Sequence, residues 1–390
     1  MKQILSKIKG DRPIWMIVII LSVFSLLAVY SSTGSLAYRF RSGNTEYYLF
    51  KHLIIILFGL GLMFVAHKIK YTYYSRISQL ALFIALPLLL VTLIRGTTIN
   101  EASRWLTLPI INISFQSSDF AKLAIIMYLA RLLTKKQETI KDLHSAFLPA
   151  IIPVILVCGL IMPANLSTAL VLFTTCMVLM FVGRVSMKYL MAMAGIALVG
   201  LTLFVVVVVN MPDTGRVGTW QNRMERFMDK ESGDTYQTDQ SKIAIATGGV
   251  FGKLPGNSTQ RNFLPHAYSD FIYAIIIEEY GLMGGVLVVL LYMMLLYRGI
   301  RIAHKSPGTF GALLAAGLSF SLVFQAMINM AVAVNLLPVT GQPLPMVSMG
   351  GTSLWFTSLA IGIILSVSRK IEEDENELEN GQAIAATTAG

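Results

Sequence analysis

Long apolar runs dominate the chain and alternate with short polar segments. About 20 apolar residues cross the hydrocarbon core of a bilayer as a helix, so we interpret these runs as membrane spans. They lie near residues 14–30, 52–67, 77–94, 119–133, 146–162, 166–183, 187–209, 270–297, 310–334 and 344–367. The pattern predicts an all-α polytopic membrane protein with about ten transmembrane helices.

The composition agrees with this interpretation. Only 13% of the 390 residues are charged, whereas a soluble domain carries about a quarter. We therefore expect one membrane domain over residues 1–370 and no separate soluble module. The remaining segment, 371–390, is acidic and then rich in small residues, which predicts a disordered cytoplasmic tail. Both cysteines fall in apolar runs and the five histidines are scattered, so neither a disulfide nor a His/Cys metal site is expected.

The positive charges are distributed unevenly between alternate loops. If the N-terminus is cytoplasmic, the cytoplasmic segments hold 18 of the 31 Lys and Arg residues. This asymmetry is the positive-inside pattern and predicts that both termini are cytoplasmic. A long loop at about 210–269, between spans seven and eight, is then extracytoplasmic. The net charge of +10 reflects topology, and no basic patch for nucleic acid is evident.

A first polar segment lies between spans three and four, on the predicted outer side. Ser117 or Ser118 can cap the fourth helix, and Asp119 suits its first turn. Lys122 follows Asp119 by three residues, so the two side chains share a face and can pair. A cap with a snorkelling lysine is one interpretation. A functional Lys122 is the other, because ionisable groups at membrane depth are costly.

The long outer loop is a second polar region. Residues Gln240 to Thr247 predict a short helix at the membrane interface, and a glycine-rich run follows it. The run is not a Walker A loop, since Thr247 stands where that motif has its first Gly and Leu254 stands where it has Ser or Thr. Lys242, Lys253 and Arg261 remain candidates to meet a phosphate-bearing ligand, with a purely structural loop as the alternative.

A third polar region opens the eighth span. Asp270 stands at its outer end, and Glu278 and Glu279 lie about two turns deeper. Helical geometry places Glu278 about 80° around the helix from Asp270 and Glu279 on the opposite side, so the three carboxylates do not form one cluster. Because buried carboxylates need partners, we expect a structural ion pair between Lys122 and Glu278 or Glu279.

A fourth segment, from Asn335 to about Ser353, contains Pro338, Pro343 and Pro345 with three glycines. Prolines interrupt helical hydrogen bonding, and such backbone is tolerated at membrane depth only where protein or a cavity surrounds it. We predict a re-entrant wall that faces the long loop.

These segments, in this order, resemble the SEDS family (shape, elongation, division and sporulation) of bacterial cell-wall proteins over nearly the whole chain. The motifs are Arg104-Trp105, Phe115-Gln-Ser through Lys122, Gln240-Ser through Gly256-Asn-Ser-Thr-Gln, Leu264-Pro through Glu279, and Leu337-Pro-Val-Thr-Gly through Gly351. The resemblance implies ten spans and an inner-membrane peptidoglycan glycosyltransferase. Such an enzyme polymerises lipid II into glycan strands and works with a class B penicillin-binding protein.

The resemblance also implies residue roles. Asp270 matches the family's essential aspartate, and we expect it to be the catalytic base of an inverting transfer. The expected substrate-binding residues are Arg104, Trp105, Gln116, Lys122, Gln240, Lys253, Asn257, Thr340 and Ser348. Three cations, Arg104, Lys122 and Lys253, would face the pyrophosphate. A divalent cation (Mg²⁺ or Mn²⁺) is an open alternative for that task.

The chain departs from the family pattern at three places. Tyr268-Ser269 precedes Asp270 where the family has His-Thr, so His266 is an open substitute for the histidine. The family's Pro-Asp-x-Gly-Thr is here Pro163-Ala-Asn-Leu-Ser, and Asp119 replaces a common Glu. The Gly256-Asn-Ser-Thr-Gln motif favours the division branch (FtsW), active at the septum, over the elongation branch (RodA). A lipid II flippase and a scaffold for the penicillin-binding protein are the competing functions.

Overall fold

The computed structural model describes residues 9–41, 44–99, 102–108, 113–210 and 236–388. Ten helices coincide with the ten predicted spans: α2 (Arg12–Ser32), α4 (Thr45–Lys68), α5 (Tyr71–Arg95), α6 (Ser117–Lys135), α7 (Leu148–Ile161), α8 (Leu166–Val182), α9 (Met187–Asn210), α12 (Ile272–Lys305), α13 (Thr309–Ala333) and α14 (Thr352–Thr388). The prediction of an all-α polytopic protein is confirmed.

Eight segments in the described part of the chain are long and apolar enough to cross a membrane. The two exceptions among the ten helices have plain causes. α8 has 17 residues and is therefore short, whereas α6 carries Asp119, Lys122 and Arg131 within its 19 residues. Both pack inside the bundle, where Ile126 of α6 and Leu179 of α8 flank Gly317 of α13.

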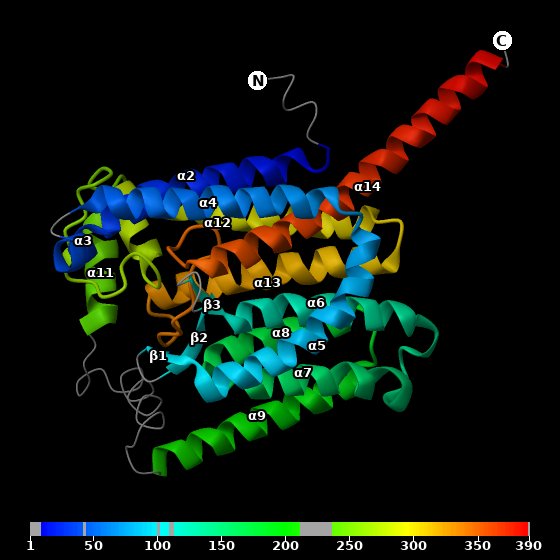
Figure 1. Cartoon of the computed structure of the whole chain (residues 1–390), viewed down its shortest axis with the longest axis horizontal. Coiled ribbons are helices and arrows are strands. Elements are labelled where there is room, and N and C mark those ends of the chain that lie inside the picture. The colour runs from blue at the N-terminus through cyan, green and yellow to red at the C-terminus, as the bar shows by residue number, and fades with distance from the viewer. Residues whose placement is uncertain (1–8, 42–43, 100–101, 109–112, 211–235, 389–390) are drawn as a thin grey trace.

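The bundle has two distinct ends (Figure 1). At one end α2 begins and α14 extends beyond the other helices. At the other end lie two shorter helices, α3 (Gly34–Arg41) and α11 (Tyr236–Gly248), together with a small sheet. α11 includes the predicted helix at Gln240–Thr247, whose existence is confirmed. α9 lies at the edge of the bundle, and its apolar side chains are mostly uncovered.

The small sheet was not predicted. Its antiparallel strands β1 (Thr97–Ile99), β2 (Ala102–Leu108) and β3 (Ile113–Gln116) connect α5 to α6. Trp105 is paired with Gln116 across β2 and β3. The hydrogen bonds of this ladder satisfy backbone groups in a segment that is too short and polar to cross a membrane. They also fix where α6 begins.

Three features differ from the sequence predictions. α14 remains helical to Thr388, where a disordered tail over 371–390 was expected, and Arg369–Glu373 and Lys370–Asp374 pairs at i,i+4 spacing support the extension. α14 begins at Thr352 rather than near 344, because residues 335–351 form the irregular segment. Gln116, not Ser117 or Ser118, occupies the N-cap of α6.

Candidate active site

Asp270 lies half-buried in the turn immediately before α12. The turn is held by hydrogen bonds that other residues donate to the backbone carbonyls of residues 268–270. Asn329 of α13 donates from Nδ2 to the Asp270 carbonyl at 2.8 Å, and Ser348 donates from Oγ to the Ser269 carbonyl. The Met349 N–H donates to the Tyr268 carbonyl at 3.0 Å. The backbone that carries the carboxylate is therefore held by two distant elements.

The irregular segment, residues 335–351, is the predicted re-entrant wall. It packs against the turn that carries Asp270, and side chains from three helices hold its carbonyls. Ser25 of α2 donates to the Val347 carbonyl at 2.7 Å, Tyr292 of α12 to that of Pro345, and Gln325 of α13 to that of Pro343 at 3.0 Å. Buried carbonyls that prolines leave outside a helix thus find partners, as a segment at membrane depth requires.

Lys122 contacts α13 one helical turn away from the residue that holds the turn of Asp270. Its ammonium is 2.7 Å from Asp119 Oδ1 and donates to Gln325 Oε1 at 3.0 Å. Gln325 and Asn329 are four residues apart on α13, which places them on one face about 6 Å apart along the helix. Gln325 contacts Lys122, whereas Asn329 contacts the Asp270 backbone, so the wall and α13 connect the cation to the carboxylate.

A cavity of about 40 Å³ adjoins Lys122 between α6, α13 and α14. Its polar lining includes Asp119, Lys122 and Gln325, and its apolar lining includes Leu322 and Phe356. Several buried polar atoms beside Lys122 and beside the turn of Asp270 have no hydrogen-bond partner among the described residues. They are Asp119 Oδ2, Asn329 Oδ1 and both amide atoms of the Gln342 side chain. The site therefore has hydrogen-bonding capacity that this conformation leaves unused.

Glu278 and Glu279 form a separate cluster on α12. The fully buried Glu278 carboxylate accepts from Lys253 Nζ at 2.7 Å, from the Thr259 N–H at 3.1 Å and from Ser258 Oγ. Glu279 accepts from Ser31 Oγ of α2. We call residues 253–260 with their two glutamates the loop anchor.

The expected ion pair between Lys122 and Glu278 or Glu279 is therefore wrong. Lys122 pairs with Asp119, and Glu278 pairs with Lys253. The physical reason is that a lysine at i+3 already lies beside Asp119 on the same helix. Glu278 instead faces the loop, whose backbone N–H groups and hydroxyls need an acceptor.

Gly281 explains how the loop anchor reaches α12. Its φ of 71° and ψ of −174° interrupt the helix, which leaves carbonyls nearby without helical donors. The Lys253 and Leu254 N–H groups donate to the carbonyls of Glu278 and Glu279, each at 2.9 Å. The backbones approach so closely that a Cβ on Gly281 would lie 2.1 Å from the Val250 carbonyl oxygen. Only glycine suits this position.

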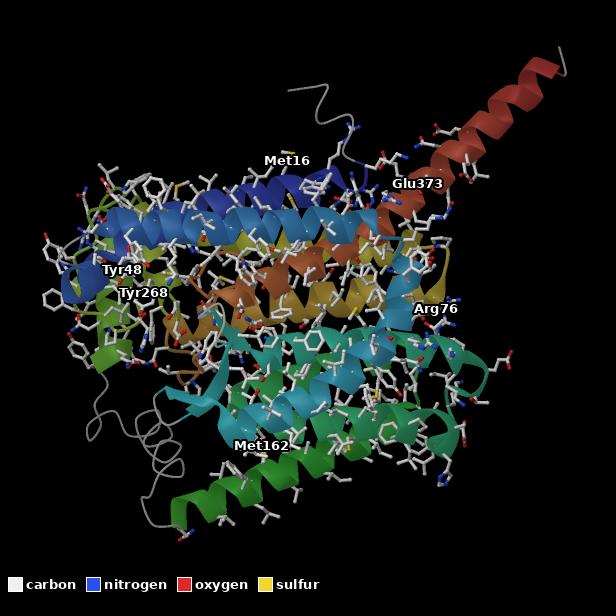
Figure 2. The ribbon with its side chains drawn as sticks, viewed as in Figure 1. Met16, Tyr48, Arg76, Met162, Tyr268 and Glu373 are labelled. Carbon is white, nitrogen blue, oxygen red and sulfur yellow. The ribbon has the colours of Figure 1, made fainter. Side chains whose placement is uncertain are left out.

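Tyr268 and His266 border Asp270. Burial, together with the Asp270 carboxylate, raises the pKa of Tyr268 above its usual value, so its phenol keeps its proton. Figure 2 shows Tyr268 close to Tyr48 of α4. The exposed His266 ring stacks edge-on against Tyr268, with centroids 6.2 Å apart. His266 therefore contacts the site through Tyr268.

The other predicted site residues are distributed around this end of the bundle. Gln116 donates to Ser118, and Asn257 donates to the Lys253 carbonyl. Thr340 is buried in the wall, Gln240 is half-buried on α11, and Trp105 lies on β2. The Arg104 side chain lies outside the described residues, although its backbone belongs to β2. Lys253 is committed to Glu278 and Thr259, which favours an anchoring role over a phosphate contact.

Sequence reasoning missed Asn329, Gln325 and Gln342. The available signal was an amide pair at i,i+4 spacing inside an otherwise apolar span, which places two polar groups on one helix face. Among the described residues, no group of three or more His, Cys, Asp or Glu side chains could hold a metal ion.

Comparison with known proteins gives consistent matches. The family FTSW_RODA_SPOVE, described as "Cell cycle protein", matches residues 11–373. The chain is 33% identical to a probable peptidoglycan glycosyltransferase FtsW of Trichlorobacter lovleyi, covering 92% of this chain and 93% of the relative. It is 34% identical to the stage V sporulation protein E of Bacillus subtilis, covering 93% and 98%.

Two solved structures share the fold. One belongs to work on a peptidoglycan synthase complex that coordinates polymerization and crosslinking, with a TM-score of 0.70, 25% identity and coverage of 93% of this chain and 98% of that one. The other is the rod shape determining protein RodA of Thermus thermophilus, with a TM-score of 0.66, 24% identity and coverage of 93% and 98%.

Proposed function

The chain belongs to the FtsW/RodA/SpoVE family of cell cycle proteins, also known as SEDS, and on this premise we propose how it acts as a peptidoglycan glycosyltransferase. The protein is a multi-pass membrane protein, and its relatives include probable peptidoglycan glycosyltransferases. The proposed substrate is lipid II, polymerised at the outer face of the cytoplasmic membrane. The proposed orientation places both termini in the cytoplasm, as the distribution of Lys and Arg favours.

The observation that carries the mechanism is the fixed backbone turn of Asp270. This turn is tied to the wall and to α13, and Lys122 contacts α13 one helical turn away. In the proposed step, the Asp270 carboxylate takes the proton of the 4-hydroxyl of the acceptor sugar. The freed oxygen attacks the anomeric carbon of the donor, the bond from that carbon to the pyrophosphate oxygen breaks, and undecaprenyl pyrophosphate leaves. Attack from the opposite face inverts the configuration.

Lys122 is the proposed stabiliser of the leaving pyrophosphate. A cation is worth most in surroundings that exclude water, and the Lys122 side chain is only 15% exposed. The adjoining cavity of about 40 Å³ has room for a few water-sized groups only, so the lipid end of the donor would lie outside it. Arg104, whose backbone lies in β2 at the same end of the bundle, is the second proposed cation. A divalent ion is not needed for this scheme, and no step is assigned to one.

Asp270→Asn tests the assignment. The purified protein, with a class B penicillin-binding protein as the proposed partner, is given labelled lipid II in detergent, and glycan length is read on a gel. General-base loss predicts a rate about 10²- to 10⁴-fold lower. Asp239→Asn on α11 is the matched control, because its carboxylate is exposed and pairs with Lys242 three residues away. A normal rate for a folded Asp270→Asn protein overturns the proposal.

The same assay separates a polymerase from a flippase. A detergent solution has no separate compartments between which lipid II could be moved. A flippase would therefore give no glycan from lipid II, whereas a polymerase would. The proposed place of action is the division septum, supported by the FtsW relatives and by the Gly256–Gln260 motif. A fluorescent fusion that labels the lateral wall instead would assign the chain to the elongation role.

A further inference from the structure

A second pocket lies at the opposite end of the bundle from Asp270. It has a volume of about 270 Å³ and is enclosed by the start of α2, the end of α12 and the part of α14 that leaves the bundle. Met16 and Glu373, labelled in Figure 2, lie at this end on α2 and α14. The proposed mechanism uses no residue of this pocket.

Four cations and three carboxylates line the pocket, and the carboxylates are already engaged. Arg298 donates from Nε to both oxygens of Asp11, at 3.1 and 3.0 Å. Lys305 pairs with Glu375 at 2.8 Å. The third carboxylate, Glu372, accepts from the Gly10 N–H.

Two cations of the lining remain uncommitted. Arg12 and Arg301 have no hydrogen bond and no ion pair within the described ranges, and both are exposed. They come from different helices, α2 and α12, which pack against each other. Two guanidinium groups that share one pocket can bind a phosphate from two directions, because each presents a fork of N–H donors.

Apolar surface lies directly beside the two arginines. On α2, Met16 is 59% exposed and Ile20 38%; on α12, Tyr297 is 62% and Ile300 44% exposed. Both helices are long and apolar enough to cross a membrane, so these side chains face lipid. A polar pocket at the end of a lipid-facing apolar surface matches a phospholipid, with its phosphate at the pocket and its acyl chains along the helices.

We infer that this pocket binds the headgroup of an anionic phospholipid, with the phosphate between Arg12 and Arg301. Basic pockets between transmembrane helices on the cytoplasmic side suit anionic headgroups, and the proposed orientation places this pocket in the cytoplasmic leaflet. The Arg298–Asp11 pair positions the start of α2 beside α12. A free phosphate shares the same chemistry, and the acyl chains distinguish the two.

Native mass spectrometry of the full chain tests the inference. The purified protein is incubated with phosphatidylglycerol or with phosphatidylcholine, and retained lipid is counted per protein. We expect selective retention of phosphatidylglycerol, reduced about fivefold in Arg301→Gln and about 25-fold in the Arg12→Gln/Arg301→Gln variant, since each basic residue contributes roughly a factor of five near an anionic surface.

Arg76→Gln/Arg184→Gln is the matched control. Both of these arginines are exposed, lie on the same predicted side of the membrane and line none of the pockets described above. The control should retain the lipid as the unaltered protein does. Inorganic phosphate in large excess, at about 10 mM, should not displace the lipid, because phosphate lacks the acyl-chain contacts. Equal retention in all variants, or displacement by phosphate, would overturn the inference.

A second measurement covers the case in which the double variant does not fold. The unaltered protein is irradiated with a phosphatidylglycerol that carries a photoreactive group near its headgroup. Cross-linked peptides should come from the start of α2 and the end of α12. Cross-links spread evenly over the other helices would contradict a defined headgroup site.

Discussion

The Glu278 carboxylate of the loop anchor and the polar groups near Lys122 and Asp270 lie at the same end of the bundle but differ in how fully they are hydrogen-bonded. In the loop anchor, both oxygens of Glu278 accept hydrogen bonds, from a lysine, two hydroxyls and two backbone N–H groups. By contrast, Asp119 beside Lys122, and Asn329 and Gln342 beside the turn of Asp270, each keep buried polar atoms without a partner in the described chain.

The difference distinguishes polar groups that stabilise the fold from polar groups that remain available to a ligand. An unsatisfied buried polar group costs about 1–3 kcal/mol, so four such atoms in one region are expensive for folding alone. A ligand rich in hydroxyl, amide and phosphate groups would satisfy them when it binds. In the loop anchor, Glu279 Oε2 and Gln260 Oε1 also lack a partner among the described residues, but both oxygens of Glu278 are engaged, which favours a structural role for the Glu278 carboxylate.

The largest effect on stability is expected for Glu278→Ala. It removes the acceptor of the loop anchor and leaves Lys253, Thr259 and Gln260 without their buried partner, which costs about 3–5 kcal/mol. The measurement is the temperature of half-unfolding in detergent. Asp239→Ala is the control, because its exposed pair with Lys242 contributes about 0–1 kcal/mol. Similar losses for both variants would contradict the anchoring role.

A smaller loss of stability, but a large loss of activity, is expected for Lys122→Met. The change leaves the Asp119 carboxylate buried without its cation and should cost about 3 kcal/mol. Adding Asp119→Asn should restore most of that stability, since the buried charge is gone. Activity on lipid II should stay low in both variants. Recovery of activity in the double variant would mean that the ion pair is only structural.

The smallest effect, with the opposite sign for stability, is expected for Gln342→Leu. Its side-chain amide is 3% exposed and unpartnered among the described residues, so an apolar replacement should raise the free energy of unfolding by about 1 kcal/mol. Polymerisation should nevertheless slow, because the amide is kept for the ligand. Unchanged polymerisation would place Gln342 outside the substrate site.

The helical framework could be predicted from the sequence because a lipid environment leaves few alternatives. Every long apolar run must satisfy its own backbone, so each became a helix at the expected place. The sheet β1–β3 could not be predicted, since residues 97–116 show neither a clear alternation nor an apolar run. The helical tail was not predicted, because an acidic composition is typical of disorder, whereas the i,i+4 pairs Arg369–Glu373 and Lys370–Asp374 favour a helix.

The candidate site was predictable only in part. Asp270, Lys122 and the proline-containing wall stand out because charge and proline are rare in apolar spans. Their partners depend on which helices touch, and sequence spacing carries that information only within one helix. It therefore indicated the Asp119–Lys122 pair as possible, but it could not reveal that Lys253, 25 residues from Glu278, is the partner of that glutamate.

The break at Gly281 divides α12 into two bodies joined end to end. The outer body, from Ile272 to Tyr280, accepts backbone hydrogen bonds from Lys253 and Leu254, whereas Leu282 and Met283 of the inner body donate to the carbonyls of Gly249 and Val250. Residues 249–254 therefore act as a splint across the break, because they bond to α12 on both sides of Gly281. A force on this loop would be passed to the turn of Asp270 and to the long span together, so the loop and α12 should move as one body.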